Sequence, residues 1–326
     1  MCVENPLSAE PTLLIVTDRQ DFTVDFVIVR LLERGLSYYR LNSDQLATST
    51  MTLCVGGGRR PRRVIACEGA SVDLECVQCV WYRRAVRPAA PESIEPSVRA
   101  FAVSELRHLY EGLICDPDIR WVNPPEATDR AERKIYQLRI AEKHGLRVPP
   151  TMVSTDHEGI AHFAEREGPV ICKPISQGLI SSEDGAYAVH THEVTHREIA
   201  EVSTLGGIPT LLQQRVPKGT DVRVTVIGAA VFAVDIVTAP DAPIDWRATR
   251  EGLIYRVCEL PVEIERACQS LMKGLGLTYG AFDFIRTEKS EWVFLEINPA
   301  GEWAWLEVEL GLSMRDALID LLYDKH

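Results

Sequence analysis

Two short apolar segments near the end of the chain each carry an acidic residue inside a predicted strand. Asp283 lies in Ala281-Phe282-Asp283-Phe284, and Glu296 lies in Phe294-Leu295-Glu296-Ile297-Asn298-Pro299. A buried carboxylate is costly unless it is paired or binds a metal. Because strand side chains alternate, Glu296 and Asn298 face the same side. Two acids on neighbouring strands with an amide oxygen nearby would hold a hard cation such as Mg²⁺. Acids on the solvated face of a hairpin are the alternative.

Other charged residues lie at the ends of predicted strands. Lys173 ends the apolar segment 169–174, and the small-residue loop around Ser176-Gln177-Gly178 follows it. A cation before a glycine-bearing loop suits phosphate binding, whereas a surface lysine before a turn is the alternative. Asp221 and Arg223 begin a later strand and share one face by alternation. A surface ion pair, which would contribute little stability, is the alternative there.

The order of the predicted elements indicates three parts. A strand over 12–17, a helix over 22–34 and a strand from residue 37 suggest a Rossmann-like sheet. The paired prolines Pro124 and Pro125 mark a boundary, because they resist continuation of a helix or a strand. The predicted parts are a Rossmann-like domain over 1–122, a central α+β lid domain over 123–209 and a C-terminal domain over 210–326.

Further elements follow from hydrophobic spacing. We predict helices over 98–113, 131–144, 262–275 and 313–322, a hairpin of 51–55 with 64–67, and strands over 79–82, 211–216, 222–227, 230–237, 281–286 and 292–297.

Composition narrows the class of protein. The chain has 35 Lys and Arg against 47 Asp and Glu, a net charge of −12, which argues against nucleic acid as a partner. The most apolar segment, 224–239, is short and interrupted by Asp235, so no membrane span is expected. The nine cysteines are odd in number and irregularly spaced, which indicates reduced thiols and a cytoplasmic protein.

The acidic motifs resemble those of a known enzyme family. Segment 294–299, with Asp283 upstream, is similar to the metal-binding signature of ATP-grasp carboxylate–amine ligases. Segments 300–307 and 80–84 resemble the microviridin-type ligases (graspetide synthetases), which cross-link ribosomal precursor peptides through ω-esters or ω-amides. The resemblance covers about residues 12–322 in order. It implies an α/β and α+β ATP-grasp fold with a Rossmann-like pre-ATP-grasp domain.

The resemblance implies phosphate-binding roles in the middle of the chain. Lys173 and Lys134 would contact the phosphates of ATP, and the loop with Ser176 and Gly178 would close over them. The neighbours of Lys134 include two arginines, so a solvated basic face is the alternative for that helix.

The same resemblance assigns the adenine, the ribose and the reacting groups. Backbone groups of Arg215 and Val216 would pair with adenine, and Gln213, where many relatives have Glu, could add a side-chain contact. Asp221 would lie near the ribose. Arg223 would lie near the reacting phosphoryl group, and Arg247 resembles a second such arginine. Asp283, Glu296 and Asn298 would hold Mg²⁺, two ions by analogy with the family.

The implied reaction is ATP-dependent cross-linking of a precursor peptide with a helical leader and an acidic core, by a homodimer. Two other hypotheses remain open from the sequence. One is an ATP-grasp ligase that joins amino acids to a small molecule or a protein tail, and the other is an ATP-binding scaffold without turnover.

Overall fold

The computed structural model describes residues 11–58, 60–86, 88–91, 93–176, 178–182, 185–201, 207–239, 241–249 and 252–324. The chain divides into two compact units, neither of which is one continuous segment. The first contains the chain up to Pro125, Glu302–Ala304 and the segment from Ser313 onward. The second contains Glu126–Gly301 and Trp305–Leu312.

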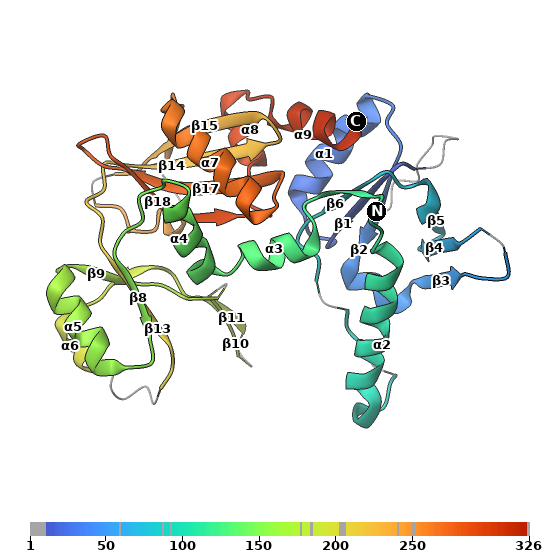
Figure 1. The fold of residues 1–326 in the computed structure, drawn as a ribbon, viewed down its shortest axis with the longest axis horizontal. Helices are drawn as coiled ribbons and strands as arrows, with labels where there is room; N and C mark the ends of the chain where they lie inside the picture. Colours follow the sequence, from blue (N-terminus) through green and yellow to red (C-terminus); the bar gives the residue numbers. More distant parts are fainter. Residues whose placement is uncertain are drawn as a thin grey trace. The chain divides into compact units, whose positions relative to one another are not determined.

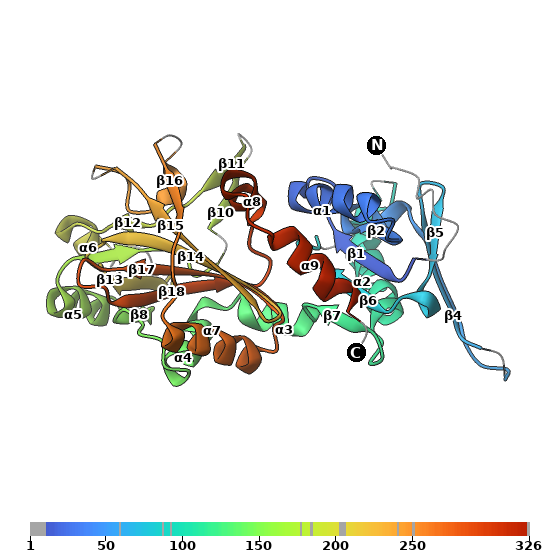
Figure 2. The same cartoon turned by 90° about the horizontal axis from the view of Figure 1, so that it is seen from above.

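A four-stranded parallel sheet forms the centre of the first unit, in the order β2-β1-β6-β7 (Figures 1 and 2). Every residue of β1 is buried, which explains its unbroken apolar sequence. The next helix, α1, begins where the Asp21 side chain accepts the Val24 N–H. This arrangement confirms the predicted Rossmann-like sheet. The elements are β1 (Leu13–Thr17), α1 (Phe22–Glu33), β2 (Tyr38–Asn42), β6 (Cys79–Tyr82) and β7 (Arg120–Val122).

An antiparallel sheet and two helices complete the first unit. The predicted hairpin forms two strands of the antiparallel sheet, and a third strand follows. The last helix of the chain packs against α1 and β6 through buried side chains such as Leu318 and Leu322. These elements are β3 (Thr50–Cys54), β4 (Arg62–Cys67), β5 (Ala70–Asp73), α2 (Pro96–Ile114) and α9 (Met314–Tyr323).

The second unit begins with a small antiparallel sheet in the order β12-β9-β13-β8. Its strand β13 starts the predicted C-terminal part but pairs with strands of the predicted lid. The small-residue loop predicted around Ser176-Gln177-Gly178 is followed directly by a strand, β10, that pairs with β11 and that the sequence did not predict. The elements are β8 (Thr151–Ser154), α5 (His157–Glu167), β9 (Val170–Cys172), β10 (Leu179–Ser182), β11 (Gly185–Ala188), β12 (His192–Glu193), α6 (His196–Glu201) and β13 (Thr210–Gln214).

A five-stranded antiparallel sheet, β16-β15-β14-β17-β18, carries the rest of the second unit. Helices α4 and α7 lie side by side on one of its faces (Figures 1 and 2). The helix predicted over 131–144 is confirmed as α4, and a further helix, α3, precedes it and starts at Pro125, where a proline is tolerated. The elements are α3 (Pro125–Ala131), α4 (Lys134–Lys143), β14 (Thr220–Ile227), β15 (Ala230–Val237), β16 (Ile254–Val257), α7 (Val262–Leu275), β17 (Tyr279–Arg286), β18 (Trp292–Asn298) and α8 (Ala304–Leu310).

The five-stranded sheet has two chemically different faces. Val222, Val224 and Val226 of β14 belong to the apolar core beneath α4 and α7, together with Phe282 and Phe284 of β17. Strand alternation therefore turns the intervening residues of both strands to the other face. That second face, hereafter the charged face, holds the acids and arginines singled out in the sequence.

A β-bulge in β18 changes which residues of this strand point to the core and which point to the charged face. Asp283 pairs with Glu296, but the next residue, Phe284, pairs with Phe294, so Leu295 is an extra residue. Without this insertion, alternation would place Phe294 on the same face as Glu296. Instead Phe294 is fully buried in the core while Glu296 remains on the charged face.

None of the helices in the described part of the chain combines the length and apolar character needed to cross a membrane.

Candidate active site

Two acids and an amide come together on the charged face. Asp283 and Glu296 are direct partners across β17 and β18. One guanidinium nitrogen, Arg247 Nη2, lies 2.6 Å from Asp283 Oδ2 and 3.3 Å from Glu296 Oε1. Asn298 Nδ2 donates to the same Asp283 oxygen at 3.2 Å. The two carboxylates are therefore close enough to share one positive group.

A second arginine approaches Asp283 from the neighbouring strand. Arg223 is the β14 partner of Asp283, and its Nη1 lies 2.9 and 3.0 Å from the two carboxylate oxygens. Burial alone would raise the pKa of Asp283, but Arg223 and Arg247 outweigh it and lower that pKa below its ordinary value. The charge of Asp283, followed by that of Glu296, raises the pKa of Arg247 despite burial. Asp283 is therefore ionised at neutral pH.

The absence of a side chain at Gly301 leaves the space that the Arg223 guanidinium occupies beside Asp283. A Cβ atom at this position would stand 2.6 Å from Arg223 Nη2 and 2.6 Å from the Ala281 Cβ. Any side chain here would displace the guanidinium from Asp283. The glycine that follows the Asn298 motif is thus required by close packing against the arginine.

The donors on the charged face fit a divalent cation. Carboxylate and amide oxygens are the hard ligands that Mg²⁺ takes, and a cationic nitrogen already bridges the two acids. Within the described part of the chain, no three His, Cys, Asp or Glu side chains form a metal-binding group. The oxygen donors that the chain offers a metal here are therefore those of Asp283 and Glu296, with the Asn298 amide beside them.

The side chains of two lysines are held by hydrogen bonds within the protein and do not extend freely into solvent. Lys173 Nζ donates to Gln213 Oε1 at 2.8 Å, and Gln213 Nε2 donates to Thr151 Oγ1 at 2.7 Å. Lys134, at the start of α4, donates to the Pro174 carbonyl at 3.0 Å. Lys134 Nζ also lies 3.8 Å from the Glu296 carboxylate. Both ammonium groups thus lie in the second unit with the acidic pair, and Lys134 is not on a fully solvated face.

Lys173 should make nucleotide binding weaken at alkaline pH. Burial, reinforced by the Lys134 and Arg247 charges and opposed by Glu296, lowers the pKa of Lys173 to about 8. Above this pH the free protein loses the positive charge of Lys173, so if this lysine binds phosphate as predicted, affinity for ADP should fall by up to about tenfold per pH unit. Calorimetric titration with ADP from pH 7 to 10 measures this slope. Lys173→Met should flatten it, and a flat profile in the native protein would contradict the role.

Lys173 should affect folding stability in the opposite direction, so that the free energy of unfolding rises with pH where affinity for ADP falls. The folded chain binds fewer protons than the unfolded chain between pH 8 and the ordinary lysine value of 10.5. The contribution of Lys173 to the free energy of unfolding therefore rises with pH through this window. Thermal unfolding without nucleotide separates this effect from ligand binding.

The predicted adenine segment is partly engaged in the sheet. The Arg215 N–H donates to the Pro169 carbonyl at 2.8 Å, so that donor is used within the protein. The Arg215 carbonyl and the Val216 N–H remain the predicted adenine contacts. Gln213 is fully buried, and its amide is oriented by Lys173 and Thr151.

The predicted phosphate-binding loop is described on both sides of Gln177, which itself lies outside the described residues. Ser176 is exposed. Gly178 has φ +68°, and a Cβ there would lie 2.7 Å from Pro174 Cγ and 2.9 Å from the Val189 carbonyl oxygen. A larger residue at this position would meet both steric and backbone strain.

Asp221 has a partner that the sequence reasoning missed. Lys218 Nζ lies 2.5 Å from Asp221 Oδ2. Burial raises the pKa of Asp221 to about 6, although the nearby Lys218 charge opposes the rise. The i, i+3 spacing of Lys218 and Asp221 in the sequence could have indicated this ion pair. The pair lies on β14 and in the turn before it, within the unit that carries Arg223.

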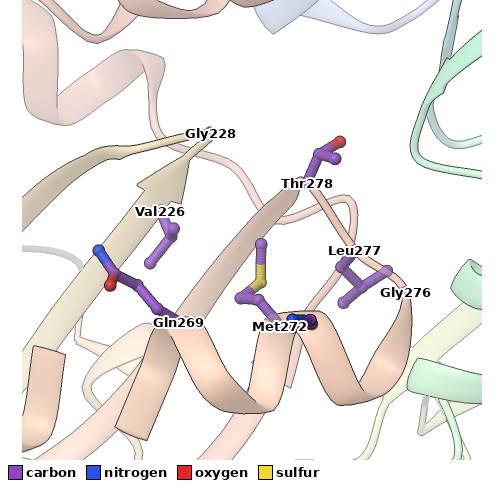
Figure 3. Close-up of a pocket in the computed structure, with 8 residues that line it drawn as sticks. Val226, Gly228, Gln269, Met272, Gly276, Leu277 and Thr278 are labelled. Atoms are coloured by element: carbon purple, nitrogen blue, oxygen red, sulfur yellow. The ribbon is translucent and has the colours of Figure 1, made fainter. Parts of the chain in front are cut away.

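A surface pocket of about 510 Å³ lies elsewhere, at the C-terminal end of α7 (Figure 3). Figure 3 shows Met272 between this helix and the strands, with Val226 on the neighbouring strand. Val226 and Met272 belong to the core beneath α7. The pocket is therefore on the opposite face of the sheet from Asp283, and it is separate from the candidate site.

Comparison with known families supports a ligase. The MvdD pre-ATP-grasp domain matches residues 12–129. The macrocyclase MdnC from Microcystis aeruginosa MRC, solved with the precursor peptide MdnA, is similar at 29% identity and a TM-score of 0.84. That match covers 95% of this chain and 99% of MdnC. A RiPP-associated ATP-grasp ligase from Chryseobacterium gregarium, in complex with ADP and a leader and core peptide, has 27% identity and a TM-score of 0.87, with 97% of each chain covered.

Curated relatives belong to the wider class. Tetrahydromethanopterin:alpha-L-glutamate ligase from Methanocaldococcus jannaschii is 23% identical over 204 residues, covering 61% of this chain and 68% of that protein. Glutathione synthetase from Thermosynechococcus vestitus is 26% identical over 180 residues, covering 53% of this chain, which spans about half of that protein (54%). Taken with the structural matches over nearly the whole chain, these relationships identify the chain as an ADP-forming ATP-grasp ligase that is similar to peptide macrocyclases.

Proposed function

We propose that this ligase closes cross-links within a ribosomal precursor peptide. A carboxylate oxygen of an Asp or Glu side chain attacks the γ-phosphorus of ATP, which forms an acyl phosphate and releases ADP. A Ser or Thr hydroxyl or a Lys amine of the same peptide then attacks the acyl carbon and loses its proton. Inorganic phosphate leaves, and an ω-ester or ω-amide remains. Phosphorylation converts the carboxylate oxygen into a good leaving group, so the protein contributes mainly positioning and electrostatic stabilisation.

The observation that carries this proposal is the similarity to MdnC, which spans 95% of this chain. MdnC is described with its precursor peptide, and the Chryseobacterium gregarium ligase with a leader and core peptide. By the same resemblance we propose that the leader docks as a helix and that the enzyme is a homodimer in the cytoplasm.

The charged face supplies the groups that the first step requires. The planar donors of Arg223 and Arg247 can stabilise the charge that develops on the transferred phosphoryl group. Lys173 and Lys134 would bind the phosphates, with Ser176 and Gly178 in the loop over them. Mg²⁺ held by Asp283, Glu296 and Asn298, two ions by our proposal, would offset the charge of the phosphate oxygens. The protein's own task is to hold the carboxylate in line with the γ-phosphorus.

Mass spectrometry of a small acidic peptide encoded beside this protein tests the proposal. Incubation with the protein, ATP and Mg²⁺ should remove about 18 Da, the mass of one water, for each cross-link formed. The loss should disappear when ATP is omitted. Methanolysis then opens esters but leaves amides intact. ADP release without any change in peptide mass would contradict intramolecular cross-linking.

A second function has its own support. Four curated relatives are glutamate ligases or a glutathione synthetase, so a ligase that adds amino acids to a small molecule or a protein tail is the alternative. ADP formation with glutamate and an amine acceptor, but not with the peptide, would favour this alternative.

A further inference from the structure

Three aromatic side chains from separate segments pack together beside Arg247. The ring centroids of Trp246 and Trp305 lie 5.7 Å apart, and those of Tyr255 and Trp305 lie 4.8 Å apart. The guanidinium carbon of Arg247 lies 5.2 Å from the centroid of the Trp246 ring. Trp246 starts a short 3₁₀ turn, Tyr255 belongs to the edge strand β16 and Trp305 to α8. We call these three residues the aromatic cluster.

The backbone around Arg247 offers little other support. Arg247 lies in a single 3₁₀ turn, Trp246–Ala248, which begins where Asp245 Oδ1 accepts the Arg247 N–H at 3.1 Å. Lys218 Nζ donates to the Ile244 carbonyl at 3.2 Å just before this turn. One turn fixes a backbone but leaves a long side chain free to rotate. The orientation of the guanidinium therefore depends on what its face and its nitrogens contact.

Some of the contacts of Arg247 would be weakened or lost if a metal ion bound the two acids. The nitrogens of Arg247 bind Asp283 and Glu296, the acids proposed to hold Mg²⁺. A cation on these acids competes for the same oxygens, whereas the face of Trp246 stays available to the guanidinium. An arginine over a tryptophan face is attracted by the negative potential of the ring. Apart from a long contact of Arg247 Nη1 with Asp245 Oδ1 at 3.4 Å, Trp246 thus provides the support that does not depend on the proposed metal ligands.

We propose that Trp246, supported by Trp305 and Tyr255, is a positioning residue that holds Arg247 toward the γ-phosphate. This inference rests on the proposed role of Arg247, and it adds the group that orients this arginine. Trp246 acts through Arg247 and has no reacting atom of its own. Loss of Trp246 should therefore weaken interactions with the γ-phosphate and spare those with the rest of the nucleotide.

The same sheet provides a matched control. Arg286 lies over the ring of Trp292 at 5.7 Å and pairs with Asp235 at 2.6 Å. This tryptophan–arginine–carboxylate arrangement is on the face of α4 and α7, where Trp292 packs against the core. Trp292→Leu therefore removes an equivalent pair without touching the charged face.

Calorimetric binding of ADP and of the β,γ-imido analogue of ATP, both with Mg²⁺ and without peptide, tests the inference. Trp246→Leu should weaken binding of the analogue by about fivefold and leave ADP within about twofold. Trp246→Phe should restore most of the loss, because an aromatic face remains. Trp292→Leu should leave the ratio of the two affinities unchanged. If Trp246→Leu does not fold, Trp305→Leu removes the support beneath Trp246 instead.

A double-mutant cycle with Arg247→Gln decides the mechanism. If Trp246 acts through Arg247, the Trp246→Leu loss should vanish in the Arg247→Gln background. Equal weakening of ADP and the analogue, or a loss that persists without Arg247, would overturn the proposal. Because no peptide is present, these outcomes are independent of whether the enzyme cross-links peptides.

Discussion

Glu296→Gln should reduce ATP-dependent ADP formation by about a thousandfold while the protein remains folded, since ligating charge at a metal contributes several kcal/mol to transition-state stabilisation. Gln preserves the shape of the side chain but removes the negative charge that faces Arg247 and Lys134. Its neutral amide is a weaker ligand for Mg²⁺. Steady-state release of ADP with Mg²⁺-ATP and the peptide measures the loss. Circular dichroism verifies the fold.

Glu291→Gln is the matched control for this substitution. Glu291 directly precedes β18 and pairs with Arg147 at 2.7 Å, where both side chains are exposed. An exposed pair contributes little, so activity should stay within about twofold of the native value. Full activity in Glu296→Gln would show that the metal assignment is wrong. Equal losses in the two variants would indicate a general effect of charge at this strand.

Arg223→Lys should lower kcat by about a hundredfold or more, the usual effect of removing a preorganised donor to a developing anion. Lysine keeps a positive charge near Asp283, so the buried carboxylate is not left without a partner. Its single ammonium nitrogen can still contact Asp283, as Arg223 Nη1 does, but it lacks the planar, forked donors that a guanidinium presents to a phosphoryl group. KM for ATP should change much less than kcat.

Arg286→Lys is the matched control for Arg223→Lys, because Arg286 lies on the face of the five-stranded sheet opposite to the charged face. Arg286 is also bound to a carboxylate, Asp235, within the five-stranded sheet, and it lies away from the acids of β18. Arg286→Lys should therefore leave kcat within about twofold, because this partly buried pair lies on the other face of the sheet and keeps a positive partner for Asp235. A similar fall in both variants would mean that Arg223 supports the sheet rather than the reaction.

The acids were predictable because burial and alternation constrain them strongly. A carboxylate among apolar strand residues is conspicuous in a sequence, and pairing of adjacent strands brought Asp283 and Glu296 together. The bulge at Leu295 was not predictable, because no proline, glycine or polar residue marks it. The contact of Arg247 with these acids also depends on tertiary packing, since its loop is thirty-six residues from Asp283.

Helix α5 and the β10–β11 hairpin were both absent from the prediction, for different reasons. Helix α5 was missed although Ile160, Phe163 and Ala164 have helical spacing and are buried, and Gly168 follows the last turn. Here the signal was present. The β10–β11 hairpin had no comparable signal, because its sequence is rich in small residues that are typical of loops.

The discontinuous first unit has a consequence for synthesis on the ribosome. Its helix α9 buries Leu318, Ile319 and Leu322, yet in the chain it follows the whole of the second unit. A nascent chain that has emerged only as far as Pro125 therefore lacks part of the packing of its own first unit. The second unit can fold as it emerges, whereas the first must remain incomplete until nearly the entire chain has been translated.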